Sequence, residues 1–370
     1  MRALNIYAGP AARQHLAQHG LQPQHVRTIP AAAGGPKGLV LGPLDRFVFG
    51  PWLSQSTQPI DLVGASIGAW RMAAACLNNP VAAFARLERD YIAQNYDVAP
   101  GRNFPLPAEV SAKFGDSLQQ FYGGRLGEVL GHARYRLHII TSRGRHLLGT
   151  EHKLATPLGY AGAFFTNAVR RKAMGAWLER VVFSAPSMTG AGQGAGHSAA
   201  MAALPFGVQD YRTRQVALSQ ANFYPALQAS CSIPFVLQAV HHIPGAPRGA
   251  YWDGGITDYH LHLNYLATDG IVLYPHFQKS VVPGWLDKAL KWRHGPTQAL
   301  VRMVVLAPNP EWIATLPRGK LPDRQDFAFH GHDLAARVAQ WTACTGAAQQ
   351  LADEFAAWLE RPDMGLVQDL

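Results

Sequence analysis

The chain has 370 residues, of which 48% are hydrophobic and 15% are charged. This length allows a large buried core, and the composition excludes an intrinsically disordered protein, which combines low hydrophobicity with high charge. The 36 glycines and 26 prolines follow no fixed period, which excludes collagen and simple repeat arrays.

The formal net charge is +9. The Lys and Arg residues are scattered, and their densest groups, residues 143–145 and 170–172, are short and match no nucleic-acid-binding motif. We therefore expect no nucleic-acid partner. A basic surface also suits an anionic membrane or an acidic substrate, or serves solubility alone.

Cys76, Cys231 and Cys344 have no CxxC spacing, so we expect neither a disulfide framework nor a metal site. The opening residues MRALNIYAGP lack the apolar run of a secretory signal, and we expect a cytoplasmic protein. Two long uncharged stretches, 181–209 and 215–247, contain Gly, Pro and polar residues that are costly in lipid, so no transmembrane helix is expected.

Short apolar runs alternate with helical stretches along the chain. The strand candidates are residues 4–8, 60–64, 137–141, 181–184, 271–274 and 303–307. The helix candidates are residues 11–19, 39–49, 67–77, 80–91, 166–179 and 332–360. This alternation predicts an α/β fold with a mostly parallel sheet that is covered by helices.

The first motif is the glycine-rich stretch Ala33-Gly34-Gly35-Pro36-Lys37-Gly38, which follows an apolar run and leads into a helix candidate. Consecutive glycines let backbone N–H groups approach a ligand, as in a phosphate cradle or an oxyanion hole. The spacing does not match a P-loop. A tight turn before a helix is the simpler interpretation, but the motif that follows favours an oxyanion hole.

The second motif is Gly64-Ala65-Ser66-Ile67-Gly68, which lies between an apolar run and an Ala-rich helical segment. This strand–turn–helix context is typical of a nucleophile elbow, whose tight turn requires Gly64 and Gly68 and exposes the serine Oγ. The N-terminus of the following helix favours a developing negative charge. We predict Ser66 as the nucleophile.

The third motif is Trp252-Asp253-Gly254-Gly255. An acid followed by two glycines can be a plain turn. A nucleophilic serine, however, needs a base within hydrogen-bond reach, and Asp253 is the best-placed carboxylate because it stands on a glycine-bounded loop.

These motifs, in this order, resemble those of the patatin-like phospholipase family. Its G-G-x-[RK]-G loop is similar to residues 34–38, its G-x-S-x-G to residues 64–68 and its D-G-[GA] to residues 253–255. The segment Ala229-Ser230-Cys231-Ser232-Ile233-Pro234 is similar to the family's A-S-x-x-x-P. The resemblance extends over about residues 3–275.

The resemblance implies a modified α/β-hydrolase core with a Ser66–Asp253 dyad that cleaves lipid esters, phospholipids or lysophospholipids, without a metal or cofactor. It implies an oxyanion hole at Gly34, Gly35, Lys37 and Gly38, and motif roles for Gly64, Gly68, Gly254 and Gly255. The chain departs from the family at Ala33, where many members have glycine. It departs again at Asp258-Tyr259-His260, where relatives often carry Asn and Pro at the wall of the acyl pocket.

Two alternatives remain open. His260 and His262 follow Asp253 in the Ser–Asp–His order of α/β-hydrolases, which would suit an esterase acting on small soluble esters. Packing, or a surface face of a strand over residues 259–263, is the plainer role for these histidines. The other alternative is a non-catalytic lipid-binding protein that keeps the fold.

Three further expectations concern a membrane-contact segment, a lid and the division into domains. Residues 284–294 predict a helix with Trp285, Ala289 and Trp292 on one face and Lys288, Lys291 and Arg293 beside it, suited to peripheral contact with an anionic membrane or to packing on the core. The Gly-rich residues 187–204 form a candidate lid over the cleft. Residues 1–280 would form the hydrolase domain, and 281–370 a mostly helical extension packed on the same core.

Overall fold

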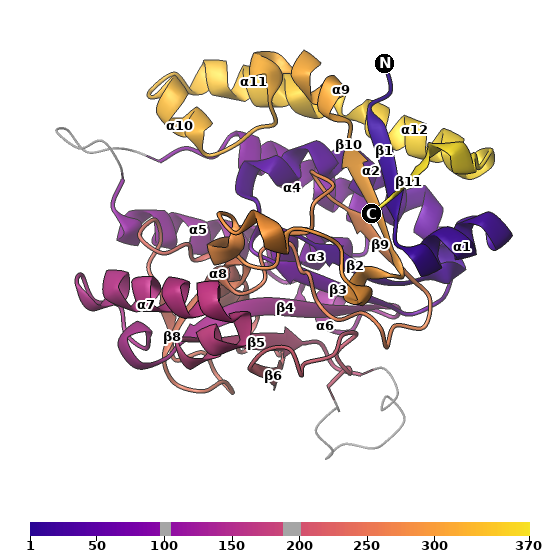
Figure 1. Cartoon of the computed structure of the whole chain (residues 1–370). Helices are drawn as coiled ribbons and strands as arrows, with labels where there is room; N and C mark the ends of the chain where they lie inside the picture. Colours follow the sequence, from indigo (N-terminus) through magenta and orange to yellow (C-terminus); the bar gives the residue numbers. More distant parts are fainter. Residues whose placement is uncertain (97–104, 188–200) are drawn as a thin grey trace.

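A mixed, mostly parallel β-sheet flanked by helices organises the chain (Figure 1). The structure is a computed structural model that describes residues 1–96, 105–187 and 201–370. Among these residues the sheet has 11 strands, in the order β11-β1-β10-β9-β2-β3-β4-β5-β6, with β8 pairing to β4 and β7 to β8. The strands are β1 (Leu4–Ala8), β2 (Val26–Ala31), β3 (Ile60–Ala65), β4 (Tyr135–Gly144), β5 (Leu178–Ser184), β6 (Thr213–Ala217), β7 (Val240–His241), β8 (Ala250–Asp253), β9 (Ile271–Pro275), β10 (Met303–Pro308) and β11 (Val367–Asp369).

The central strands are built from continuous apolar runs. Every residue of β5, β9 and β10 is buried, as expected for strands that are covered on both faces. The central strands β10, β9, β2, β3 and β4 run parallel to one another, so β2 and β3 end at the same edge of the sheet. That edge holds the loops that begin at Ala32 and Ser66.

Helices join the strands and pack on the sheet. They are α1 (Pro10–His19), α2 (Gly42–Phe47), α3 (Ile67–Ala75), α4 (Pro80–Ile92), α5 (Pro107–Tyr122), α6 (Leu126–Leu130), α7 (Ala155–Val169), α8 (Phe223–Cys231), α9 (Pro310–Thr315), α10 (Gln325–His330), α11 (Leu334–Ala347) and α12 (Gln349–Glu360). In Figure 1, α9 to α12 lie along the top of the molecule, over α2 and α4. None of the helices in the described ranges has both the length and the apolar character needed to cross a bilayer.

The C-terminal residues contribute to the same sheet and core. Strand β10 lies between β1 and β9, and β11 pairs with β1. Phe355 of α12 is fully buried, with its ring 6.0 Å from that of Phe47 and 5.7 Å from that of Trp52. The domain division at residue 280 stays a prediction.

All six expected strands are present, but the helix expected over residues 166–179 is wrong. Helix α7 begins at Ala155 and ends at Val169, and Leu178 already belongs to β5, where it pairs with Gly144. Pairing with β4 is a long-range interaction that local periodicity does not reveal. The stretch 39–49 is also divided, into a 3₁₀ segment (Gly35–Leu41) and α2.

The helix expected over residues 284–294 is also wrong, because two short 3₁₀ turns, Trp285–Asp287 and Lys291–Arg293, replace it. Packing of both tryptophans on the core is not observed either, since Trp285 is 41% and Trp292 72% exposed. Residues 259–263 form no strand. Of the candidate lid, residues 188–200 lie outside the described residues.

Candidate active site

Ser66 occupies the turn between β3 and α3. Its φ of 56° lies in the left-handed region, which side chains other than glycine rarely adopt and which marks a strained turn. A Cβ on Gly64 would lie 2.4 Å from the Cα of Ala69, and one on Gly68 would lie 1.9 Å from the carbonyl oxygen of Ala31. Only glycine fits these two positions, which explains the G-x-S-x-G spacing.

The backbone of Ser66 is held by a residue distant in sequence. Its N–H donates to Ser230 Oγ at 3.0 Å, and the Ser230 hydroxyl donates to the carbonyl of Ile140 at 2.7 Å. Ser230 thus ties the turn to α8 and β4. The sequence pointed to this segment only through the family resemblance, without a role for Ser230.

Asp253 is the last residue of β8 rather than part of a free loop. Its Oδ2 accepts a hydrogen bond from Ser66 Oγ at 2.6 Å, and its Oδ1 accepts one from the N–H of Gly255 at 2.7 Å. Ser66 is 4% and Asp253 5% exposed. The structure therefore brings together the two residues that the motifs singled out, and holds them in a largely water-excluded contact.

The glycines after Asp253 permit close packing under this contact. A Cβ on Gly254 would lie 2.1 Å from the carbonyl oxygen of Ile140, and one on Gly255 would lie 2.5 Å from the Cβ of Ala33. The acid motif therefore packs directly against the residue that precedes Gly34.

Burial raises the pKa of Asp253 above its usual value, because a charged carboxylate is disfavoured away from water. The Ser66 hydroxyl, the positive charge of Arg324, the Gly255 N–H and the positive charge of Lys288 all act in the opposite direction on this pKa. The net result is a carboxylate that holds a proton more readily than one in water.

The glycine-rich loop follows β2 and reaches the same place. Gly34 and Lys37 line a cavity together with Ser66 and Asp253, whereas Gly35 and Gly38 are buried and do not line it. Gly35 has a φ of 57°, which favours glycine there. Next to it, a Cβ on Gly34 would lie 2.5 Å from the ring of Phe277.

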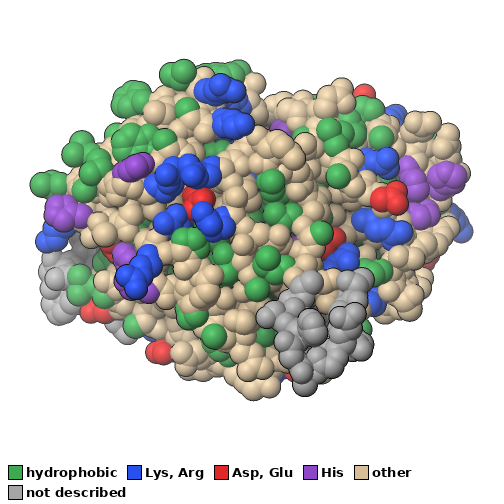
Figure 2. Space-filling model, turned by 90° about the horizontal axis from the view of Figure 1, so that it is seen from below, with side chains coloured by type: hydrophobic (Ala, Val, Ile, Leu, Met, Phe, Trp, Pro, Cys, Tyr) green, Lys and Arg blue, Asp and Glu red, His purple; other side chains and the backbone are tan. Residues whose placement is uncertain are grey.

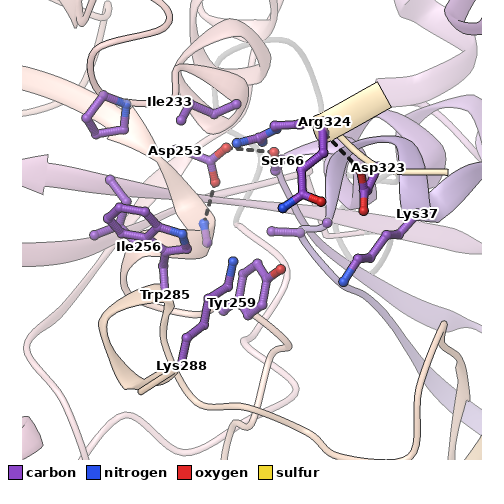
Figure 3. Close-up of a pocket in the computed structure, with 15 residues that line it drawn as sticks. Lys37, Ser66, Ile233, Asp253, Ile256, Tyr259, Trp285, Lys288, Asp323 and Arg324 are labelled. Atoms are coloured by element: carbon purple, nitrogen blue, oxygen red, sulfur yellow. Dashed lines mark hydrogen bonds between the residues drawn. The ribbon is translucent and has the colours of Figure 1, made fainter. Parts of the chain in front are cut away.

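The cavity has a volume of about 230 Å³ (Figure 3). Its lining residues come from both halves of the chain: Ala33, Gly34, Lys37, Ser66, Ile233, Pro234, Asp253, Gly255, Ile256, Tyr259, Trp285, Lys288, Asp323, Arg324 and Gln325. Five of them lie beyond residue 280, and the sequence singled out neither Asp323, Arg324 nor Gln325. No local pattern marks these residues, because only the packing of the C-terminal residues brings them to Ser66.

The two candidate histidines have partners of their own. The backbone N–H of Val282 donates to His260 Nδ1 at 3.1 Å, and burial holds the pKa of His260 well below its usual value. His262 contacts the carbonyl of Val281 through Nδ1 and the hydroxyl of Thr297 through Nε2. Within the described residues, no histidine hydrogen-bonds to Ser66 or Asp253.

Residues 258–260, where the chain departs from the family pattern, have different contacts. Asp258 is fully buried and pairs with Arg180 at 2.6 Å and with Arg171 at 3.3 Å. Tyr259 lines the cavity, and its ring stacks on that of His260 with 4.2 Å between centroids. Asp258 thus anchors the loop, and Tyr259 forms the wall.

No group of three or more His, Cys, Asp or Glu side chains in the described parts of the chain is arranged to hold a metal ion.

A strained serine at a strand–helix turn, hydrogen-bonded to a buried aspartate, has the geometry of a nucleophile elbow on an α/β fold. A family model for patatin-like phospholipases matches residues 58–260. The chain therefore belongs to the patatin-like phospholipase family, a family of lipid acyl hydrolases. A search among curated proteins gave no match.

Proposed function

We propose that the protein is a serine acyl hydrolase that cleaves the carboxylic esters of lipids, namely phospholipids or lysophospholipids. The reaction passes through an acyl-enzyme at Ser66, with Asp253 as the base. The observation that carries this proposal is the 2.6 Å hydrogen bond from Ser66 Oγ to Asp253 Oδ2 beside a cavity. The raised pKa of Asp253 supports it, because such a carboxylate is a stronger base than one in water.

In the first half of the reaction, Ser66 Oγ bonds to the ester carbonyl carbon while its proton passes to Asp253 Oδ2. The carbonyl oxygen takes the negative charge, with Gly34 and its loop and the N-terminus of α3 as the groups that stabilise it. The bond to the alcohol then breaks, and the alcohol leaves with the proton held by Asp253. Water repeats these steps and releases the fatty acid.

A fluorophosphonate probe tests whether Ser66 is activated. We expect covalent labelling, located at Ser66 by mass spectrometry, and no labelling of a Ser66→Ala variant. A folded protein that binds lipid but resists the probe would be the non-catalytic alternative and would contradict the proposal.

We further propose that the mouth of the cavity contacts a lipid surface. Helix α7 contains no charged residue, and Leu158, Phe165 and Val169 on one of its faces are 66%, 67% and 87% exposed. On the opposite face, the ring of Tyr160 lies 6.0 Å from that of Phe235, which is 60% exposed and follows the lining residue Pro234.

We call the exposed side chains around α7 the apolar rim; it consists of Leu154, Leu158, Phe165, Val169, Phe235, Val236, Trp285 and Trp292. The Arg293 guanidinium donates to Asn167 Oδ1, so the turn that carries Trp292 lies against α7. Figure 2 looks onto the molecule from below, and hydrophobic side chains gather along the left of this face with Lys and Arg side chains beside them. Apolar and basic groups together favour an anionic bilayer.

Vesicle flotation tests the contact. We expect binding to vesicles with phosphatidylglycerol to exceed binding to pure phosphatidylcholine, and Phe165→Ser with Val169→Ser to reduce it about tenfold or more. Leu266→Ser is the matched control, because Leu266 is 52% exposed and is not part of the apolar rim. Equal reduction by the control would contradict the proposed surface.

Two further proposals concern the location of the protein in the cell and its domains. The three cysteines are buried and unpaired, which supports a reducing, cytoplasmic location, with the membrane contact peripheral. We also propose that residues 1–280 form a hydrolase domain and that residues 281–370 form a C-terminal extension packed on the same core. Because the extension supplies β10 and β11 to the sheet, limited proteolysis of the full chain tests this division, and a first cleavage near residue 280 is the outcome that supports it.

A further inference from the structure

Three cationic side chains line the cavity that holds Ser66 and Asp253. Lys37 comes from the loop after β2, Lys288 follows the 3₁₀ turn Trp285–Asp287, and Arg324 immediately precedes α10. In Figure 3, Lys37 lies to the right of the Ser66–Asp253 pair, Lys288 below it and Arg324 above it. Positive charge thus surrounds the place where the ester would bind.

These cations have no ion-pair partner among the described residues, and two of them lie over aromatic rings instead. The Lys288 ammonium is 4.2 Å from the centre of the Tyr259 ring, and the Lys37 ammonium is 5.5 Å from that of Phe277.

The two carboxylates of the cavity already have partners. Asp253 accepts hydrogen bonds from Ser66 and from the N–H of Gly255. Asp323 pairs with the Lys320 ammonium at 2.7 Å and accepts a hydrogen bond from the N–H of Gln325 at 2.8 Å. The charge of Asp253 acts on Lys288 and Arg324, and that of Asp323 acts on Lys37, but neither carboxylate forms an ion pair with these side chains. Two carboxylates therefore face three cations in the cavity.

The like charges also act on one another. Partial burial first, and then the positive charges of Lys37 and Arg324, lower the pKa of Lys288 to about 8, although the negative charge of Asp253 acts in the opposite direction. An anion bound among the three side chains would relieve this repulsion. A neutral or zwitterionic group would relieve less of it.

We infer that Lys288 and Arg324, together with Lys37, form a subsite for an anionic group, a phosphate or a carboxylate, that the ester substrate carries near its scissile bond. The guanidinium of Arg324 can bind such a group with two parallel hydrogen bonds, and the lysines add point charges. This inference rests on the proposed function. It assigns substrate selection to residues outside the segment 58–260 that matches the family model.

The test compares two esters that share an acyl chain and a glycerol backbone, 1-acylglycerol phosphate and 1-monoacylglycerol. We expect the wild-type protein to prefer the phosphate ester, measured as the ratio of the two kcat/KM values. Lys288→Gln and Arg324→Gln should each lower this ratio about tenfold, and the double variant about a hundredfold, mainly through KM of the phosphate ester.

Two further variants sharpen the result. Lys113→Gln removes an exposed lysine of α5 that does not line the cavity, and it should leave the ratio unchanged. Arg324→Lys keeps the charge but loses the two-pronged geometry, so its ratio should fall between wild type and Arg324→Gln. A ratio near one in the wild type, or equal loss on both esters in the double variant, would overturn the inference.

Inorganic phosphate tests whether the subsite binds a free anion or only an anion that is attached to the lipid. Competitive inhibition of monoacylglycerol hydrolysis, weakened in the double variant, means that the free anion is sufficient. A preference for the phosphate ester without such inhibition means that the anion must be attached to the lipid. Both results support the subsite. Failure of the proposed function is distinguishable, because the wild type would then hydrolyse neither ester and would resist the fluorophosphonate probe.

Discussion

The floor and the mouth of the cavity differ in how they are built. The floor consists of Ser66 and Asp253, both at most 5% exposed, and of glycines whose positions admit no side chain. The mouth consists of exposed side chains such as Trp285, Lys288 and Arg324, carried by residues beyond 280. Under the proposed function, this difference separates bond cleavage, which needs a rigid and dehydrated contact, from the proposed selection of substrates, which needs groups that reach into solvent.

The strongest test of this comparison removes the chemistry at the floor. We expect Ser66→Ala and Asp253→Asn each to lower kcat/KM on a short neutral ester by about 10⁴-fold or more, with little further loss in the double variant, because the two residues act as a unit. Steady-state kinetics with circular dichroism as the check of folding measures this.

The control for that test is the pair of histidines. His260→Ala and His262→Ala should each keep activity within about tenfold, since both side chains bond to groups other than the dyad. If either variant lost as much activity as Asp253→Asn, a Ser–Asp–His triad would replace the dyad.

The second test concerns the glycine framework of the floor. Gly68→Ala should destabilise the protein by about 3 kcal/mol or more, because its Cβ would lie 1.9 Å from a backbone oxygen that cannot move away. Urea unfolding measures the change.

Gly346→Ala is the matched control, because this glycine lies within α11 and no atom is within 4 Å of the added Cβ. It should stabilise the protein by about 0.5–1 kcal/mol, through helix propensity alone. A folded Gly68→Ala protein of wild-type stability would contradict the close approach of α3 to β2.

The third test uses pH to change the charge of Lys288 at the mouth of the cavity. Because the pKa of Lys288 is lowered to about 8, its ammonium is charged below that pH and neutral above it. The preference for an anionic ester should therefore fall, about tenfold at most, as pH rises through 8, and Lys288→Gln should remove this dependence. If the ratio of kcat/KM values for the anionic and the neutral ester did not change with pH in the wild type, Lys288 would have no role in substrate selection.

The smallest expected effect is the change in the free energy of unfolding when Asp253 is replaced. The pKa of Asp253 is raised in the folded protein, so the folded state binds this proton more tightly than the unfolded state does. The resulting stability is complete below the unfolded-state pKa and is lost as pH rises through the raised pKa. Asp253→Asn, which carries no charge, should therefore be about 0.5–2 kcal/mol more stable than wild type at pH 7.

Thermal unfolding across pH checks this sign. The difference between Asp253→Asn and wild type should shrink as pH falls toward the ordinary carboxyl range. The activity of the wild type should fall over the same interval, because the base becomes protonated. A variant that is less stable at pH 7 would mean that the Asp253 carboxylate is net stabilising.

The sequence alone determined the parts of the molecule in which neighbours along the chain set the geometry. Six strands followed from short apolar runs, and the turn at Ser66 followed from glycines two residues on either side of it, because the steric limits of a strand–turn–helix are local. The two glycines after Asp253 and then the family resemblance pointed to Asp253 as the base of Ser66, although the two residues lie 187 positions apart.

Only the tertiary structure decided which distant residues meet. Residues 181–184 are a strand, as predicted, but pairing with β4 extends this strand back to Leu178, into the stretch 166–179 that was predicted as a helix. Helix α7 instead begins at Ala155 and ends at Val169. The packing of residues beyond 280 brought Lys288 and Arg324 to Ser66. The pattern of residues 284–294 marked Lys288 only for membrane contact or core packing, and no pattern marked Arg324, because the approach of both residues to Ser66 depends on long-range contacts.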